Sequence, residues 1–322
     1  MKLVTTLRDG RSSVGALDGD RVVDLTAVAV RRRSANAAWF DDMLALIRAG
    51  AAGLDHARDL ASAATEDETR PLASVRLLAP VPRPEQIRCF AAFEEHGVRS
   101  AAAMLKVMAS RAPDPVNAEA ELRASGRFSI PKMWYERPLY YKGNRFSVVG
   151  TRCDIEWPSY SQVVDFELEL GCVLGLQGKN ITREQAGSHI FGYTVCNDLS
   201  ARDAQSIEMQ APLGPAKGKD FDGGLAMGPC VVTADEFDRS GAVMIVRVNG
   251  EEWSRGHARD MHHTFEDMIR YVSDSETLYS GEMFLSGCVG GGSGMELGRY
   301  AQRGDTIELE IGGIGVLSNR IV

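Results

Sequence analysis

The chain has 322 residues, of which 44% are apolar and 25% are charged. This composition supports roughly two domains' worth of hydrophobic core and excludes intrinsic disorder over most of the length. Acidic side chains outnumber basic ones by 44 to 36, and the net charge of −8 argues against a nucleic-acid-binding protein, which normally presents a basic face. No apolar run approaches the ~20 residues of a membrane-spanning helix, and the N-terminus turns polar too early for a secretory leader.

The six cysteines are scattered along the chain, and no pair has the CxxC spacing of a zinc knuckle. Several of them lie inside apolar runs that resemble strands. We therefore expect reduced, buried thiols in a cytoplasmic protein.

The N-terminal segment predicts a small β unit. Its short apolar stretches are separated by Asp9-Gly10 and Asp18-Gly19-Asp20, which are strong hairpin signals. Residues 38–63 follow with helical spacing of their apolar side chains. A proline-rich stretch at 80–84 marks a boundary. We expect a small N-terminal β-rich domain over residues 1–76.

The rest of the chain, residues 77–322, is predicted to form one larger domain. Its first part contains a mixed insertion at about 97–137, with helical patterns on either side of a loop, which is typical of a functional or mobile lid. From residue 138 strand signals dominate, and helical patterns are few, at 182–190 and 263–273. The fold class is therefore predicted to be β-dominated α+β.

The most informative segment is the run VDFELELG at 164–171. Because alternate side chains of a strand share a face, Asp165, Glu167 and Glu169 are predicted to point to one side. Like charges on a buried face repel each other and are costly to desolvate without a partner. A divalent cation would relieve both costs, and oxygen-only ligands select magnesium, manganese or calcium. The pattern equally fits an amphipathic strand with a solvated acidic face.

A second segment, GYTVCND at 192–198, predicts a strand that ends in Asn-Asp. Asp198 lies where this strand meets a turn, a position from which a carboxylate can face a cleft. Alternatively, Asp198 is the N-cap of a helix that begins at Leu199. The two segments together favour a shared carboxylate site.

Three collinear motifs, DFELEL, GYTVCNDLSARDAQ and GPAKGKDFD, resemble those of the fumarylacetoacetate hydrolase superfamily, and the closing run GDTIELEIGGIGVLSNRIV resembles that family's C-terminal strand pair. The resemblance covers roughly residues 77–322, and the opening β segment fits the N-terminal domain of the shorter bacterial, acylpyruvate-hydrolase-like members. It implies the family's mixed β-sandwich roll with a small N-terminal β-rich domain. It also implies a homodimer.

The same resemblance implies a metal site. Family members bind magnesium, manganese or calcium through a Glu-x-Glu pair and a downstream Asp, which correspond here to Glu167, Glu169 and Asp198. Asp165 would then have a supporting role. The fumarylacetoacetate hydrolases proper use a further Asp seven residues before the catalytic histidine, where this chain has Cys89. This departure implies three carboxylates completed by water or substrate.

By this resemblance the catalytic histidine is His96, and its partner is Glu296 in the run SGCVGGGSGMELGRY. A carboxylate that accepts one imidazole N–H fixes the tautomer and raises the basicity of the other nitrogen, so the pair would activate water. On the residues alone, His96 also fits a surface position, and Glu296 an exposed strand position. The glycine run at 290–294 lacks a dinucleotide-binding fingerprint and is interpreted as a tight turn that lets backbone approach a ligand.

Four further residues are candidates for contact with substrate. Tyr141 and Gln205 correspond to substrate-binding residues of the family, and Lys219 to a lysine near the metal that would stabilise developing negative charge. Tyr141 also fits a core aromatic and Lys219 a surface charge. Cys288 replaces the family's threonine, and because a thiol donates hydrogen bonds weakly, it is expected to weaken carboxylate binding or to mark a different substrate.

These assignments predict a hydrolase that cleaves a C–C bond of a small 2,4-dioxo (acylpyruvate-like) acid. Mg²⁺, or Mn²⁺ or Ca²⁺, would chelate the carboxylate and keto oxygens and stabilise the enolate, while His96 and Glu296 activate water. The main alternative is decarboxylation, isomerisation or dehydration of an oxo acid by the same metal–enolate chemistry. A second alternative is a non-catalytic protein with a structural metal, which a lid bearing His96 argues against. No nucleic-acid or membrane partner is expected.

Overall fold

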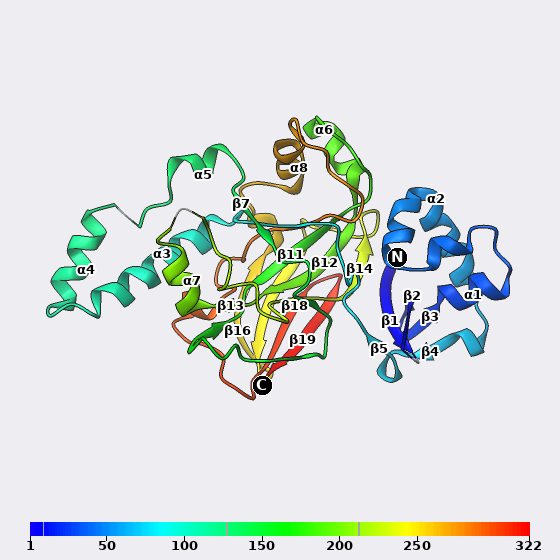
Figure 1. The fold of residues 1–322 in the computed structure, drawn as a ribbon, viewed down its shortest axis with the longest axis horizontal. Helices are drawn as coiled ribbons and strands as arrows, with labels where there is room; N and C mark the ends of the chain where they lie inside the picture. The colour runs from blue at the N-terminus through cyan, green and yellow to red at the C-terminus, as the bar shows by residue number, and fades with distance from the viewer. Residues whose placement is uncertain (9, 127, 212) are drawn as a thin grey trace.

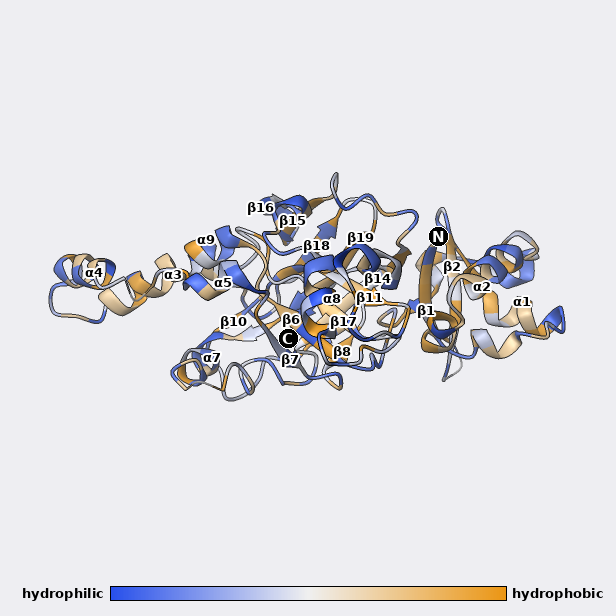
Figure 2. Ribbon diagram, turned by 90° about the horizontal axis from the view of Figure 1, so that it is seen from above, coloured by the Kyte–Doolittle hydropathy of each residue, from blue (hydrophilic) through white to orange (hydrophobic). Residues whose placement is uncertain are grey.

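The computed structural model describes residues 1–8, 10–126, 128–211 and 213–322. A small N-terminal unit lies at one end of an elongated molecule, a helical arm lies at the other end, and a strand-rich body lies between them (Figures 1 and 2). The fold is a strand-rich α+β arrangement with mixed sheets, which confirms the predicted fold class. Among the described residues, none of the helices has both the length and the apolar character that a bilayer crossing requires.

The N-terminal unit is an antiparallel meander, as its hairpin signals predict. β1 (Lys2–Arg8) pairs with β2 (Arg11–Asp18), and β2 pairs with β3 (Arg21–Asp24). Gly19 takes a positive φ of 58° in the second turn, a conformation that glycine adopts without strain. Asp9, in the first predicted turn, lies outside the described residues.

The N-terminal sheet continues into the body. β1 pairs with β14 (Leu225–Thr233) as well as with β2, so the predicted boundary at residue 76 does not interrupt the sheet. The helix predicted at 38–63 forms as a 3-10 turn, η1 (Ala37–Phe40), followed by α2 (Met43–Ser62). α1 (Leu25–Arg31) is a helix that the sequence did not predict, because its threonine and valines weaken the helical signal.

The insertion forms a helical arm. α3 (Glu94–Ala109) and α4 (Pro115–Ala124) form a hairpin that extends away from the body, and α5 (Lys132–Glu136) returns the chain to it (Figure 1). The base of α3 packs against α9 (Gly294–Leu297), so it is the start of the insertion that lies at the candidate site.

The body is built from two sheets that share one core. The strands β11, β12 and β14 of the large sheet pack against the second sheet through β15, β18 and β19. The large sheet has the order β4-β3-β2-β1-β14-β12-β11-β17-β6-β7, with β5 on β1 and β8 on β14, and the second has the order β16-β15-β18-β19-β9. The remaining strands of the large sheet are β4 (Thr69–Pro71), β5 (Arg76–Leu77), β6 (Ile87–Phe90), β7 (Tyr140–Gly143), β8 (Val148–Val149), β11 (Leu168–Leu174), β12 (Ile190–Asp198) and β17 (Met283–Leu285).

The second sheet and the short elements complete the body. The strands of the second sheet are β9 (Asp154–Ile155), β15 (Val243–Val248), β16 (Glu251–His257), β18 (Thr306–Ile311) and β19 (Gly315–Ile321), and β10 (Val164–Asp165) pairs with β13 (Ser200–Ala201). The other helices are α6 (Arg183–Ala186), α7 (Arg202–Glu208) and α8 (Phe265–Ser273), with 3-10 turns η2 (Glu66–Glu68), η3 (Leu72–Ser74), η4 (Gly187–His189) and η5 (Ala258–Asp260).

β11 and β12 are buried along their whole length in the middle of the large sheet. Most of their side chains are apolar, as expected for strands that are covered on both faces. Charged side chains at the ends of these strands are therefore exceptional, and they mark the candidate site.

Candidate active site

The predicted acidic strand is interrupted at Phe166. β10 ends at Asp165, and β11 begins at Leu168. Asp165 Oδ1 accepts the backbone N–H of Phe166 at 2.9 Å, and this local bond takes the donor out of the sheet ladder. Glu167 and Glu169 lie together, as expected, and Asp165 is linked to Glu167 because the guanidinium of Arg202 contacts both carboxylates.

Glu167, Glu169 and Asp198 converge at the end of the β11–β12 pair. One carboxylate oxygen from each lies within 4.8 Å of the others, and all three residues are buried, which overturns the alternative of a solvated acidic face. The antiparallel register sets Leu168 opposite Asn197 and so brings the two strand ends together. Asp198 is the last residue of β12, and α7 begins four residues later, so Asp198 is not the N-cap of a helix.

Lys219 lies among these carboxylates and is buried, so the alternative of a surface charge is wrong. Its ammonium nitrogen is 2.8 Å from Glu167 Oε2, 2.9 Å from Asp198 Oδ2 and 3.0 Å from the Asp198 carbonyl oxygen. These three acceptors match the three N–H donors of the ammonium group. Burial opposes its charge, but the carboxylates of Asp198 and Glu167 raise the pKa of Lys219 overall.

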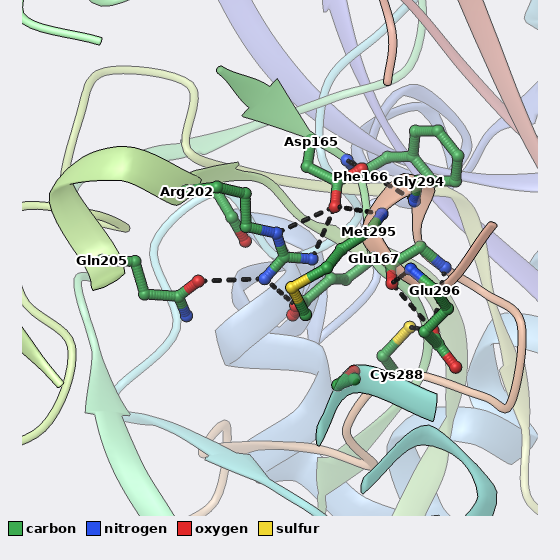
Figure 3. Close-up of polar contacts among 12 residues, drawn as sticks. Asp165, Phe166, Glu167, Arg202, Gln205, Cys288, Gly294, Met295 and Glu296 are labelled. Atoms are coloured by element: carbon green, nitrogen blue, oxygen red, sulfur yellow. Dashed lines mark hydrogen bonds and ion pairs between the residues drawn. The ribbon is translucent and has the colours of Figure 1, made fainter. Parts of the chain in front are cut away.

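Arg202 is a member of the site that the sequence analysis missed. Its guanidinium donates to Asp165 Oδ2 at 2.8 Å and lies 2.6 Å from Glu167 Oε1 (Figure 3). It also donates to Gln205 Oε1 at 2.9 Å, so the glutamine reaches the carboxylates through this arginine. The available signal was the motif SARDAQ, which sets Arg202 and Gln205 three residues apart on one face of α7.

The charge balance of this region fits a divalent cation. Four buried carboxylates, counting that of Asp165, face two buried cations, which leaves two negative charges uncompensated. Burial, together with the charges of Asp198 and Glu167, raises the pKa of Glu169 well above its ordinary value. Glu169 Oε2 accepts the backbone N–H of Gly287 at 2.9 Å. Oxygen donors in this number and charge suit Mg²⁺, Mn²⁺ or Ca²⁺, and Glu167, Glu169 and Asp198 would hold such an ion.

Tyr141 and Cys89 lie beside this group on neighbouring strands. The Tyr141 hydroxyl donates to Asp198 Oδ2 at 2.5 Å, and Cys89 is paired with Tyr141 in the β6–β7 ladder. Burial, together with the charges of Asp198 and Glu169, raises the pKa of the Cys89 thiol well above its ordinary value. Position 89 therefore holds a neutral thiol, and the anionic set consists of three carboxylates.

His96 and Glu296 form a pair at the junction of α3 and α9. His96 Nδ1 is 2.9 Å from Glu296 Oε2, with the imidazole 19% exposed and the carboxylate fully buried. Glu296 is helical and its side chain is buried, so the alternative of an exposed strand position is wrong. Its Oε2 also accepts from the Oγ of Ser293 at 2.7 Å, and its Oε1 accepts the N–H of Gly291 at 2.8 Å. The sequence signal for this arrangement is the capping box S-x-x-E at 293–296.

Asp165 and the glycine run hold α9 in place. The carboxylate of Asp165 accepts the backbone N–H groups of Gly294 at 2.8 Å and Met295 at 3.0 Å (Figure 3). A Cβ at Gly294 would lie 2.6 Å from Asp165 Oδ1, and one at Gly290 would collide with Glu95 on α3. The glycine run is thus a tight turn, as interpreted from the sequence, and it makes room for Asp165 and for the first turn of α3.

Cys288 lies next to this pair and is buried. Its Sγ is 3.7 Å from Glu296 Oε2 and 3.4 Å from the Val289 carbonyl oxygen. Burial raises the pKa of the thiol well above its ordinary value, and the charges of Glu296, Glu167 and Glu169 add to this effect. Cys288 therefore lies within electrostatic reach of both the dyad and the carboxylate group.

Comparisons with known proteins identify the family of this chain. Residues 113–322 match the fumarylacetoacetate (FAA) hydrolase C-terminal family. A mitochondrial oxaloacetate tautomerase of Homo sapiens is 34% identical over 195 residues, a match that covers 60% of this chain and 60% of the human protein. The oxaloacetate tautomerase YisK of Bacillus subtilis is 30% identical over 279 residues, which are 83% of this chain and 81% of that protein.

Two solved structures have the same fold. A fumarylacetoacetate hydrolase from Exiguobacterium antarcticum has a TM-score of 0.72 and 27% identity, over 100% of this chain and 99% of that one. A maleylpyruvate hydrolase from Sphingobium sp. SYK-6, in complex with manganese(II) and pyruvate, has a TM-score of 0.72 and 22% identity over 100% of this chain and 99% of that one. With the family match over residues 113–322, these likenesses show that the chain belongs to the fumarylacetoacetate hydrolase family.

Proposed function

We propose that this chain is a divalent-metal-dependent enzyme that hydrolyses a C–C bond of a 2,4-dioxo acid. The observation that carries the proposal is that a group of carboxylates lies close to a histidine–glutamate pair. The buried carboxylates of Glu167, Glu169 and Asp198 suit a hard cation, and His96 with Glu296 forms a general-base pair. The backbone bridge between Glu167 and Ser293, the N-cap of the helix that carries Glu296, supports this neighbourhood of the two groups.

A cation held by the three carboxylates would polarise the carboxylate and keto oxygens of the substrate as a Lewis acid. Glu296 accepts a hydrogen bond from the Nδ1–H of His96 and so leaves the unprotonated Nε2 as the base. Nε2 takes a proton from water, and the hydroxide formed adds to the distal carbonyl carbon of the substrate. The C–C bond then breaks, and its electron pair goes to the pyruvate-type fragment, which leaves as an enolate and takes the proton back from the imidazolium. Lys219 contributes a fixed positive charge beside the developing negative charge.

The alternative of tautomerisation has specific support, because several relatives at 30–34% identity are named oxaloacetate tautomerases. In that reaction His96 would move a proton between carbon and oxygen of a 2-oxo diacid, with no attack by water and no loss of a fragment. The two reactions differ in their products, so one experiment separates them.

The test is a panel of 2,4-dioxo acids and oxaloacetate, followed by ultraviolet absorbance and by chromatography of the products, with Mg²⁺ and with EDTA. Hydrolysis predicts loss of the enol absorbance together with a carboxylic acid and a pyruvate-type acid in equal amounts. Tautomerisation predicts faster keto–enol equilibration of oxaloacetate with no new acid. A chain that turns over none of these compounds in the presence of Mg²⁺ would contradict both reactions.

A further inference from the structure

Three donors of different chemistry meet at the base of the arm: a ring nitrogen of His96, the Sγ of Cys288 and a carboxylate oxygen of Glu296. These atoms lie within 4.8 Å of one another. They come from α3, from the loop after β17 and from α9, so the fold brings them together from three elements. None of the three belongs to the carboxylate group of Glu167, Glu169 and Asp198.

The contacts of these side chains favour a site that binds an ion over a cluster whose side chains only pack against one another. The Cys288 thiol is 2% exposed, and its contacts at 3.4 Å and 3.7 Å are those of a weak donor. Glu296 is fixed by Ser293 and Gly291, which is the outer support that oriented metal ligands need. The imidazole of His96 is 19% exposed, so an ion has access to the cluster from solvent.

The donors of His96, Cys288 and Glu296 select a different kind of ion from the one that the neighbouring carboxylate group selects. Sulfur, nitrogen and oxygen donors with one open position suit Zn²⁺ and Co²⁺, whereas three carboxylates suit Mg²⁺, Mn²⁺ or Ca²⁺. We propose that His96, Cys288 and Glu296 form a second cation site that binds a thiophilic divalent ion such as Zn²⁺. When the ion binds, the S–H bond of Cys288 breaks, the proton passes to solvent, and the thiolate keeps the electron pair for the metal.

Such an ion would occupy the nitrogen and the carboxylate that serve as the base. It would therefore inhibit the enzyme, and this consequence depends on the proposed function, whereas the binding itself does not. Zn²⁺ is expected to inhibit the Mg²⁺-loaded enzyme without displacing Mg²⁺ from the carboxylates, because the two sites share no ligand.

Binding is tested with Co²⁺ as the probe, on the full chain with excess Mg²⁺ to fill the carboxylate site. A thiolate ligand gives a sulfur-to-cobalt charge-transfer band in the near ultraviolet, which carboxylate ligands do not give. We expect this band at one Co²⁺ per chain, and we expect added Zn²⁺ to bleach it. Cys288→Ser is expected to abolish the band, and His96→Ala to weaken Co²⁺ binding by at least the ~10–100-fold that loss of a supporting residue costs.

Cys153→Ser is the matched control, because Cys153 is more exposed than Cys288 and lies outside the site. This variant is expected to keep the band. Absence of the band in the unaltered chain would overturn the proposal whatever the variants do, and so would a band that persists in a folded Cys288→Ser chain. If the chain hydrolyses no dioxo acid and the band still forms, the proposed function fails while the second cation site stands.

Discussion

The carboxylate of Asp165 holds the N-terminus of the helix that carries Glu296. It accepts two backbone N–H groups at the start of α9, and it also binds Arg202, which contacts Glu167. The cation ligands and the base pair are therefore joined by one chain of buried contacts. A change at Asp165 is expected to act on the base through the position of α9, without contact with substrate.

Asp165→Asn tests this connection. The amide has one acceptor oxygen, so it cannot satisfy Arg202 and both N–H groups of α9. We expect kcat to fall by about 10²-fold, because a displacement of about 1 Å in a catalytic group has that cost. Breaking the buried pair with Arg202 is expected to lower the free energy of unfolding by about 3–5 kcal/mol. Steady-state kinetics and urea unfolding measure the two effects.

The control for this variant is Asp203→Asn on α7, next to Arg202. Asp203 accepts from Ser161 and Gln162, away from the carboxylates. It is expected to leave kcat within a few-fold of the unaltered chain. Equal losses of kcat in the two variants would contradict a specific role for Asp165.

Glu169→Gln tests the cation site. The amide keeps the shape of the side chain and removes one of the charges that the cation neutralises. We expect loss of Mg²⁺ and Mn²⁺ binding in isothermal titration calorimetry and loss of metal-dependent turnover. The metal-free variant is expected to be at least as stable as the unaltered chain, because a buried charge without an ionic partner has been removed. Glu184→Gln, on the exposed surface of α6, is the control, and Mg²⁺ binding that survives in Glu169→Gln would place the site elsewhere.

Much of the fold could be predicted from local patterns. The hairpins of the N-terminal unit, the buried strands and the two arm helices follow from turn residues and apolar periodicity. The break at Phe166 could not be predicted, because it depends on which donor Asp165 captures. The resemblance indicated the carboxylates and the His96–Glu296 pair. Arg202 was missed, because its role in the site depends on its contact with Asp165, which is 37 residues away in the sequence.

The metal-free chain is expected to lose stability as the pH rises. Burial and the neighbouring carboxylates raise the pKa of Glu169 above its value in the unfolded chain, near 4.5. Between these two pKa values the folded chain binds more protons than the unfolded chain, so the free energy of unfolding falls with pH, by at most about 1.4 kcal/mol per pH unit for each proton. The stabilisation is complete below the unfolded pKa and is lost as the pH rises through the folded one. Urea unfolding in EDTA at a series of pH values measures the slope.

Two comparisons isolate the contribution of Glu169 to that slope. Glu169→Gln carries no proton at this position, so its unfolding free energy is expected to depend less on pH. Saturating Mg²⁺ is expected to stabilise the unaltered chain more at high pH than at low pH, because the ion competes with the proton. If the unfolding free energy of Glu169→Gln depends on pH as steeply as that of the unaltered chain, groups other than Glu169 cause the pH dependence.

His96→Ala and Glu296→Gln test whether these two residues act as one base. If the reaction is hydrolytic, each single change is expected to lower kcat by ~10²–10⁴-fold, because the water loses its proton acceptor or the acceptor loses its orientation. Mg²⁺ affinity is expected to stay within a few-fold, since neither residue belongs to the carboxylate group. Groups that act as a unit lose their effect together, so the double variant is expected to be no slower than the slower single variant. If the two losses multiply in the double variant, His96 and Glu296 act independently, and the 2.9 Å contact between them has no part in catalysis.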